Sequence, residues 1–158
     1  MPTSCVVDTN VAVIANGNSG TSADCELACV ELLRELTKEG QIALDFGDRI
    51  FTEYRTNLGM SGQPGVGDAF MRLVATNRFN PERCEQVELH VVGPTDNDFS
   101  EFPADPALAS LDPADRKFVA VANAPQPGRV LHVGIDRDWK RHQVALAAAG
   151  VNLSFRCP

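Results

Sequence analysis

Two aspartates follow short apolar runs that have the composition of buried β-strands. Asp8 follows CVV at residues 5–7, and Asp136 follows RVLHVGI at residues 129–135. A carboxylate at the end of a buried strand loses much of its hydration, which is costly unless a cation or hydrogen-bond donors compensate. We therefore expect each aspartate to have a partner, and a bound cation is one group that would serve.

Two further acids occupy positions from which they could join the first pair. Glu53 borders the apolar face of a predicted helix and precedes Asn57 by four residues. Asp115 lies in LDPADRKFVAVANA at residues 111–124, where Asp112 is the predicted N-cap of another helix. The sequence thus offers four carboxylates on four separate predicted elements.

Each of these acids also has an ordinary structural explanation. Asp115 would complement the dipole of its helix, and Glu53 would suit a solvated helix surface. Asp136 or Asp138 would cap the last helix, and Asp8 would begin a turn. Taken singly, Asp115 and Glu53 are better explained in this way than as site residues.

Apolar periodicity divides the chain into alternating strands and helices. Helically spaced apolar residues, an N-terminal cap and a closing Gly40 predict a helix over residues 22–40. The same reasoning predicts further strands and helices at 4–9 (strand), 41–45 (strand), 48–59 (helix), 69–77 (helix), 84–93 (strand), 111–124 (helix) and 129–155 (strand, helix, strand).

This alternation predicts an α/β fold, with residues 1–158 forming a single three-layer α/β/α domain around a mainly parallel central sheet. In such sheets, functional groups gather at the carboxyl ends of the strands. Asp8 and Asp136 both follow predicted strands, so we expect them to lie at the same edge.

Composition and charge exclude several classes of protein. The 158 residues are 44% hydrophobic, which suffices for one well-buried core. The net charge of −7 has the wrong sign for binding a long stretch of nucleic acid through its phosphates. No segment approaches the roughly 18 consecutive apolar residues of a membrane helix, and the N-terminus lacks the features of a signal peptide. We expect a cytoplasmic protein with no membrane partner.

Five cysteines, an odd number without a CxxC pair, argue against a disulfide framework and against a zinc ribbon, so we expect reduced thiols. Cys25 and Cys29 lie four residues apart on the predicted helix, a spacing that would also suit two metal ligands. Leu32, Leu33 and Leu36 extend the same face, which favours core packing over ligation.

Four segments together resemble the PIN-domain family of ribonucleases. They are VVDTNVAVIANG near the start, IFTEYRTNL after the second strand, LDPADRKFVAVANA, and VGIDRDW near the end. The resemblance covers about residues 4–155, in the order that the family uses, and the first and third segments are its most specific parts.

The resemblance implies a metal-dependent endoribonuclease that hydrolyses RNA phosphodiester bonds with Mg²⁺ or Mn²⁺. The family's catalytic acids correspond to Asp8, Glu53, Asp115 and Asp136, of which Asp8, Asp115 and Asp136 would bind the metal ion. Glu53 would orient or deprotonate water, and the supporting residues would be Asn10 and Asp138. Small members are often toxins, which implies an antitoxin protein and a homodimer as partners.

Basic residues beside the acids would provide a local positive rim for RNA phosphates. The candidates for this role are Arg116, Lys117, Arg137, Lys140 and Arg141. The same residues would equally serve as ordinary solvated charges. The family often has Ser or Thr two residues before its last acid, where this chain has Gly134.

Two other functional interpretations remain open. A PIN-like scaffold without catalysis would bind protein or RNA, although retention of all four acids argues against it. A phosphatase resembling the haloacid dehalogenases would need a second aspartate two residues after the first, and Asn10 occupies that position.

Overall fold

One parallel sheet organises the chain. The computed structural model describes residues 4–17, 19–59, 65–125 and 128–157. Within them, five strands pair in the order β3-β2-β1-β4-β5, and every pair is parallel. The strands are β1 (Cys5–Val7), β2 (Ile42–Asp45), β3 (Cys84–Val87), β4 (Val130–Val133) and β5 (Asn152–Phe155). The expected single α/β/α domain with a parallel sheet is confirmed.

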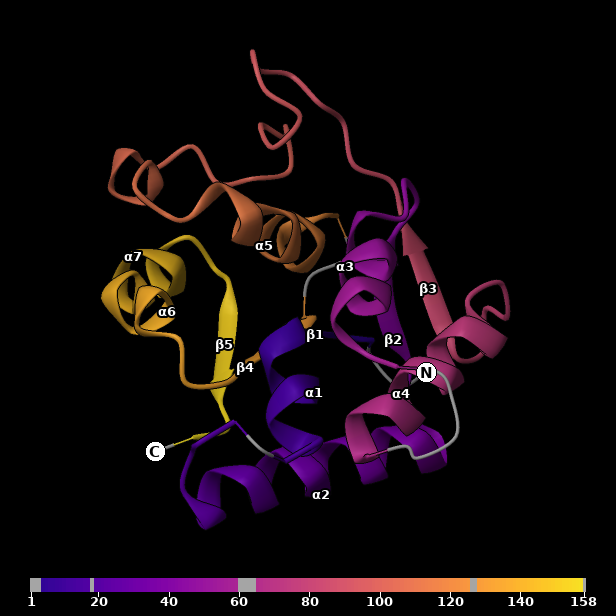
Figure 1. The fold of residues 1–158 in the computed structure, drawn as a ribbon. Helices are drawn as coiled ribbons and strands as arrows, with labels where there is room; N and C mark the ends of the chain where they lie inside the picture. Colours follow the sequence, from indigo (N-terminus) through magenta and orange to yellow (C-terminus); the bar gives the residue numbers. More distant parts are fainter. Residues whose placement is uncertain (1–3, 18, 60–64, 126–127, 158) are drawn as a thin grey trace.

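Helices cover both faces of this sheet (Figure 1). They are α1 (Thr9–Ala15), α2 (Ala23–Glu39), α3 (Arg49–Asn57), α4 (Val66–Asn77), α5 (Arg116–Asn123), α6 (Arg137–Arg141) and α7 (Gln143–Ala148), with short 3₁₀ turns η1 (Pro106–Leu108) and η2 (Pro113–Asp115). Because parallel crossovers are right-handed, the connections from β1 to β3 place α1–α4 on one face, and the return to β4 and β5 places α5–α7 on the other. None of the helices in the described part of the chain is long and apolar enough to cross a membrane.

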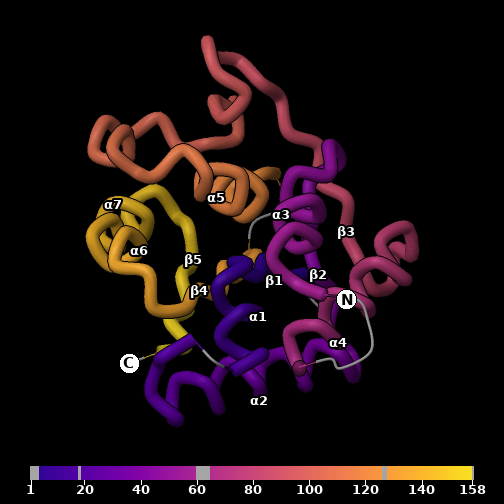
Figure 2. The backbone as a smooth tube through the Cα atoms, in the orientation of Figure 1, coloured from indigo at the N-terminus to yellow at the C-terminus, as the bar shows by residue number. Residues whose placement is uncertain are grey.

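Several elements differ from their predicted bounds. The strand predicted over 4–9 ends at Val7, because Thr9 already begins α1, and the helix predicted over 111–124 begins as the turn η2 before α5. The strand expected over 84–93 ends at Val87, because its neighbour β2 ends at Asp45 and offers no further backbone partner. The chain then leaves the sheet and extends beyond α5 before returning to η2 (Figure 2). The last predicted helix is divided into α6 and α7 at His142, whose backbone departs from helical geometry.

The core brings α3 against the carboxyl end of β1. Tyr54 on α3 is fully buried, and its hydroxyl donates a hydrogen bond to the carbonyl of Val7. The Tyr54 ring also packs edge-to-face on Phe70 of α4, with 5.4 Å between the ring centroids. These contacts place the adjacent Glu53 beside the segment that follows β1.

A disulfide joins Cys25 near the start of α2 to Cys157 beyond β5, across a sequence separation of 132 residues. Cys5, Cys29 and Cys84 are free and buried. The expectation that all the cysteines are reduced is therefore wrong for this pair. Nothing in the local sequence marks the pairing, because the fold alone brings α2 beside the segment after β5.

Candidate metal site

An acidic cleft opens at the carboxyl ends of the central strands. It has a volume of about 340 Å³ and is lined by Asp8, Thr9, Asn10, Val13, Glu53, Asn57, Asp115 and Asp136. These residues come from the segment after β1, from α3, from η2 and from the start of α6. The structure thus brings together the four acids that the sequence singled out, and Asn10 with them.

Asp8 is buried in the wall of this cleft, with a relative exposure of 5%. It precedes α1, yet its side chain makes no capping hydrogen bond to that helix within the described chain. Instead, the indole Nε1 of Trp139 donates to Asp8 Oδ2 at 3.1 Å. Burial, with a smaller contribution from the charges of Glu53 and Asp136, raises the pKa of Asp8 to about 7, although the hydrogen bond from Trp139 acts in the opposite direction.

Asp45 shows how a strand-end carboxylate is satisfied without a metal ion. It ends β2 and is fully buried, whereas Asp8 directly follows β1 and is almost fully buried. Its two oxygens accept hydrogen bonds from the backbone N–H groups of Arg49 and Ile50, at 2.9 and 2.8 Å, at the start of α3. Asp45 is therefore a helix cap, whereas Asp8 leaves capacity for a further partner.

Asp115 has the least satisfied carboxylate of the cleft. Its Oδ2 atom is buried and has no hydrogen-bond partner among the described residues. Burial, together with the neighbouring negative charges, of which Asp8 contributes most, raises the pKa of Asp115 to about 8. A buried oxygen without a donor, facing other carboxylates, is the arrangement that a cation would stabilise.

Glu53 is held in place by two donors. Its Oε1 atom accepts from Lys117 Nζ at 2.7 Å, and its Oε2 atom accepts from the hydroxyl of Thr9. Lys117 is only 7% exposed and donates also to the carbonyl of Ala114. Because each carboxylate oxygen can accept more than one hydrogen bond, the anchored Glu53 can still accept one from water in the cleft.

Asp136 lines the cleft, whereas Asp138 lies outside it. Asp136 is exposed at the cleft and caps α6 by accepting from the backbone N–H of Asp138 at 3.0 Å. The Asp138 side chain lies outside the cleft lining, where its Oδ2 accepts from the N–H of Asp112 at 3.0 Å. Asp138 therefore connects the start of η2 to α6, the two elements that carry Asp115 and Asp136.

Two of the five cations expected to meet RNA are engaged inside the protein. Arg116 donates to Asp98 Oδ1 and to the carbonyl of Ala109, both at 3.0 Å. Lys117 is buried against Glu53, so neither forms an exposed rim. The exposed cations beside Asp136 are Arg137, Lys140 and Arg141. Their contact with RNA stays a prediction.

Gly134 lies where the PIN-domain pattern often has a hydroxyl residue. A Cβ atom at Gly134 would lie 2.9 Å from Cδ1 of Ile14 and 3.6 Å from Nδ2 of Asn10. The end of the Ile14 side chain therefore occupies the space that a side chain at 134 would take. This chain supports the site by packing at that point rather than by a hydroxyl group.

Sequence reasoning missed three residues that hold the acids in position: Thr9, Lys117 in its contact with Glu53, and Trp139. Thr9 follows Asp8 directly, and Trp139 is the single tryptophan of the chain, three residues after Asp136. These adjacencies were the available signals, but neither one reveals which acid the side chain contacts.

No family model matches this chain, and neither a curated protein nor a solved structure matches it. A functional assignment therefore depends on the chemistry of the cleft itself.

Proposed function

We propose that this protein is a metal-dependent endoribonuclease with a PIN-like active site in the acidic cleft. The observation that carries the proposal is the buried, unpartnered Oδ2 of Asp115 in a cleft that also contains Asp8, Glu53 and Asp136. Four carboxyl groups in one small cleft repel one another, and the raised pKa values of Asp8 and Asp115 reflect burial first and this repulsion second.

The donor types, all carboxylate oxygens, suit a hard divalent cation. Asp8, Asp115 and Asp136 offer carboxylate oxygens, the ligands that Mg²⁺ and Mn²⁺ prefer, and we assign these three residues to metal binding. The open cleft leaves room for water and a substrate phosphate, which such cations retain as ligands. When bound, the cation would neutralise charge on the phosphodiester and acidify a water molecule.

The remaining residues would position the reactants. Trp139 fixes the orientation of the Asp8 carboxylate, and Lys117 with Thr9 fixes that of Glu53. Glu53, held at the cleft wall, would accept a proton from the attacking water or orient it. The amides of Asn10 and Asn57 also line the cleft and would donate hydrogen bonds to phosphate oxygens.

The resemblance to PIN domains is the basis for proposing RNA as the substrate class. It is also the basis for proposing that the protein is the toxin of a toxin–antitoxin pair, with an antitoxin partner and a homodimeric assembly. The acidic net charge means that phosphates would be met locally. Arg137 and Lys140 are exposed immediately after Asp136 and would contact the phosphates that flank the cleft.

A binding scaffold without catalysis is the second candidate, and one observation favours it. Both oxygens of Glu53 already accept hydrogen bonds inside the protein, from Lys117 and Thr9. Each of these bonds occupies an acceptor position that an attacking water molecule would otherwise use. The scaffold would bind RNA without cutting it.

The test is cleavage of a mixed pool of structured and single-stranded RNA in Mn²⁺, Mg²⁺ or EDTA. The native protein should cut only with metal, and both Asp8→Asn and Asp115→Asn should lower the rate by more than about 100-fold. Asp96→Asn is a matched control, because it makes the same charge change at an exposed position outside the cleft. Metal-dependent RNA binding without cleavage would support the scaffold instead, and cleavage that survives in both variants would contradict the proposed site.

A further inference from the structure

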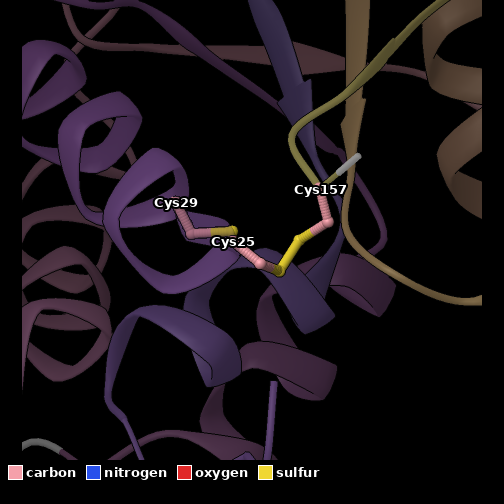
Figure 3. A group of neighbouring side chains, drawn as sticks. All are labelled: Cys25, Cys29 and Cys157. Atoms are coloured by element: carbon pink, nitrogen blue, oxygen red, sulfur yellow. A yellow bond between two sulfur atoms is a disulfide. The ribbon is translucent and has the colours of Figure 1, made fainter. Parts of the chain in front are cut away.

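Three buried cysteines gather at a second place in the fold. Cys25 and Cys29 lie on α2, Cys157 lies just beyond β5, and all three are between 0% and 2% exposed. Their sulfur atoms lie within 4.8 Å of one another. Figure 3 shows the Cys29 side chain pointing toward the disulfide between the other two. None of them lines the acidic cleft, so this trio is a separate feature.

We propose that, when the Cys25–Cys157 disulfide is reduced, the three cysteines form a thiolate site for a divalent cation of the Zn²⁺ class. Thiolate ligands favour Zn²⁺ over hard cations such as Mg²⁺ and Mn²⁺. With the disulfide closed, two of the three sulfurs are bonded to each other and cannot serve as ligands. The disulfide and the metal ion therefore exclude each other. This inference does not depend on the proposed nuclease function.

The spacing of the sulfurs suits a tetrahedral ion. A Zn–S distance of about 2.3 Å places neighbouring sulfurs about 3.8 Å apart, within the 4.8 Å limit that all three sulfurs satisfy. From the bonded state, Cys25 and Cys157 sulfurs must separate by about 1.8 Å to reach that spacing. Cys157 lies beyond the end of β5, so this adjustment does not require the strand to move. A water molecule or an external donor would complete the fourth position.

Arg156 supplies charge that is complementary to such a site. Three thiolates around a divalent cation carry one net negative charge, which is costly in an apolar interior. Arg156 directly precedes Cys157 in the chain, and its positive charge acts on the Cys29 thiol. The Nε atom of Arg156 is buried and has no hydrogen-bond partner among the described residues. The Nη1 atom of Arg156 already donates to Ser154 Oγ at 3.3 Å, so the unpartnered Nε is the atom of this cation that remains available to an anionic metal–thiolate group.

The site would form in two steps, reduction of the disulfide and then binding of the cation. A dithiol or phosphine reductant gives two electrons to the disulfide, which takes up two protons to become two thiols, and the reductant is oxidised. Binding of the cation then displaces the protons of the three thiols to solvent. Oxidation of Cys25 and Cys157 by a disulfide reagent reverses the sequence and releases the cation.

The test uses the whole chain, reduced by a phosphine and kept free of oxygen, with Co²⁺ as the spectroscopic probe. We expect one equivalent of Co²⁺ to bind with a thiolate-to-cobalt charge-transfer band, and Zn²⁺ to displace it. The disulfide-bonded protein should give no such band. Reduced protein without the band would overturn the proposal.

Cys29→Ser is the decisive variant, because it retains the disulfide and its fold can be checked by circular dichroism before reduction. It should bind Co²⁺ more than about 10-fold more weakly than the native protein. Cys84→Ser replaces another buried free cysteine and should bind as the native protein does. Asp8→Asn should keep the band, which separates this site from the acidic cleft. If Cys29→Ser does not fold, Cys29→Ala replaces it. Native-like Co²⁺ binding by either Cys29 variant would show that Cys29 is not a ligand and would overturn the three-thiolate site.

Discussion

The indole N–H of Trp139 on α6 donates a hydrogen bond to the Asp8 carboxylate after β1, across 131 residues of sequence and at 3.1 Å. Trp139 is fully buried, so the bond is shielded from water. It fixes one oxygen of Asp8 and links the segment after β1 to the helix that begins beyond Asp136. The acids of the cleft are thus positioned by contacts between distant elements.

Trp139→Phe should weaken both the fold and the site. The change removes the N–H donor and leaves a cavity, so we expect a loss of about 2–4 kcal/mol in the free energy of unfolding. The pKa of Asp8 should rise further, because the donor that lowers it is gone. Urea unfolding and the pH dependence of Mn²⁺ binding measure the two effects. An unchanged pH dependence would contradict the positioning role of Trp139.

Asp8→Asn and Asp45→Asn should have opposite effects on stability in EDTA. At Asp8, the amide oxygen can still accept from Trp139 and a repulsive charge is lost, so stability should be retained or increased. At Asp45, an NH₂ group replaces one acceptor of the α3 cap, so we expect a loss of about 1–2 kcal/mol. Mn²⁺ should no longer stabilise Asp8→Asn but should still stabilise Asp45→Asn. Thermal unfolding of both variants, each with and without Mn²⁺, measures these four stabilities. Equal losses of stability in the two variants in EDTA would contradict the different roles of Asp8 and Asp45.

Stability without metal should fall as the pH rises. The pKa values of Asp8 and Asp115 are raised from the ordinary value of 3.8 to about 7 and about 8, so the folded state favours their protonated forms. Their stabilising contribution is complete below about pH 4 and is lost as the pH rises through about 7 to 8. In EDTA, Asp115→Asn should therefore flatten the pH profile of the unfolding free energy, and Asp96→Asn should leave it unchanged. The assigned shifts would be contradicted if the unfolding free energy of the native protein rose with pH between about 4 and 8, or if Asp115→Asn left the profile unchanged.

Lys117→Met tests whether this lysine anchors Glu53 or contacts RNA. Loss of a mostly buried ion-pair partner should cost about 1–3 kcal/mol of stability and should lower kcat. KM should change little, because Lys117 is not at the surface. Arg137→Ala and Lys140→Ala should instead raise KM with kcat nearly unchanged, since these residues are exposed. A raised KM in Lys117→Met would return it to the RNA-binding set.

The alternation of strands and helices could be predicted from the sequence because it depends on local periodicity. Runs such as CVV before Asp8, and the cap formed by Asp112 and Pro113, are local signals that the structure retains. Parallel strands end at one edge of a sheet, so the proximity of Asp8 and Asp136 could be predicted from the sequence. Glu53 and Asp115 follow no strand and were implied only by the resemblance to PIN domains. The bond from Trp139 to Asp8 depends on packing between elements that are distant in sequence, so no local pattern encodes it.

The same limit explains the misplaced cations and the unpredicted disulfide. Arg116 and Lys117 follow Asp115 directly, and adjacency in sequence suggested a shared surface. Adjacent residues of an α-helix point about 100° apart, so Lys117 contacts Glu53 whereas Arg116 contacts Asp98. The pairing of Cys25 with Cys157 likewise follows from the position of β5 at the edge of the sheet rather than from cysteine spacing.

The most direct test of the central claim is calorimetric titration of Mn²⁺ into metal-stripped, disulfide-bonded protein, comparing the native chain with Asp115→Asn and Asp96→Asn. We predict that the native chain and Asp96→Asn bind Mn²⁺ alike and that Asp115→Asn binds it more than about 10-fold more weakly. Equal binding by all three, or no binding by the native chain, would contradict a metal site in the acidic cleft.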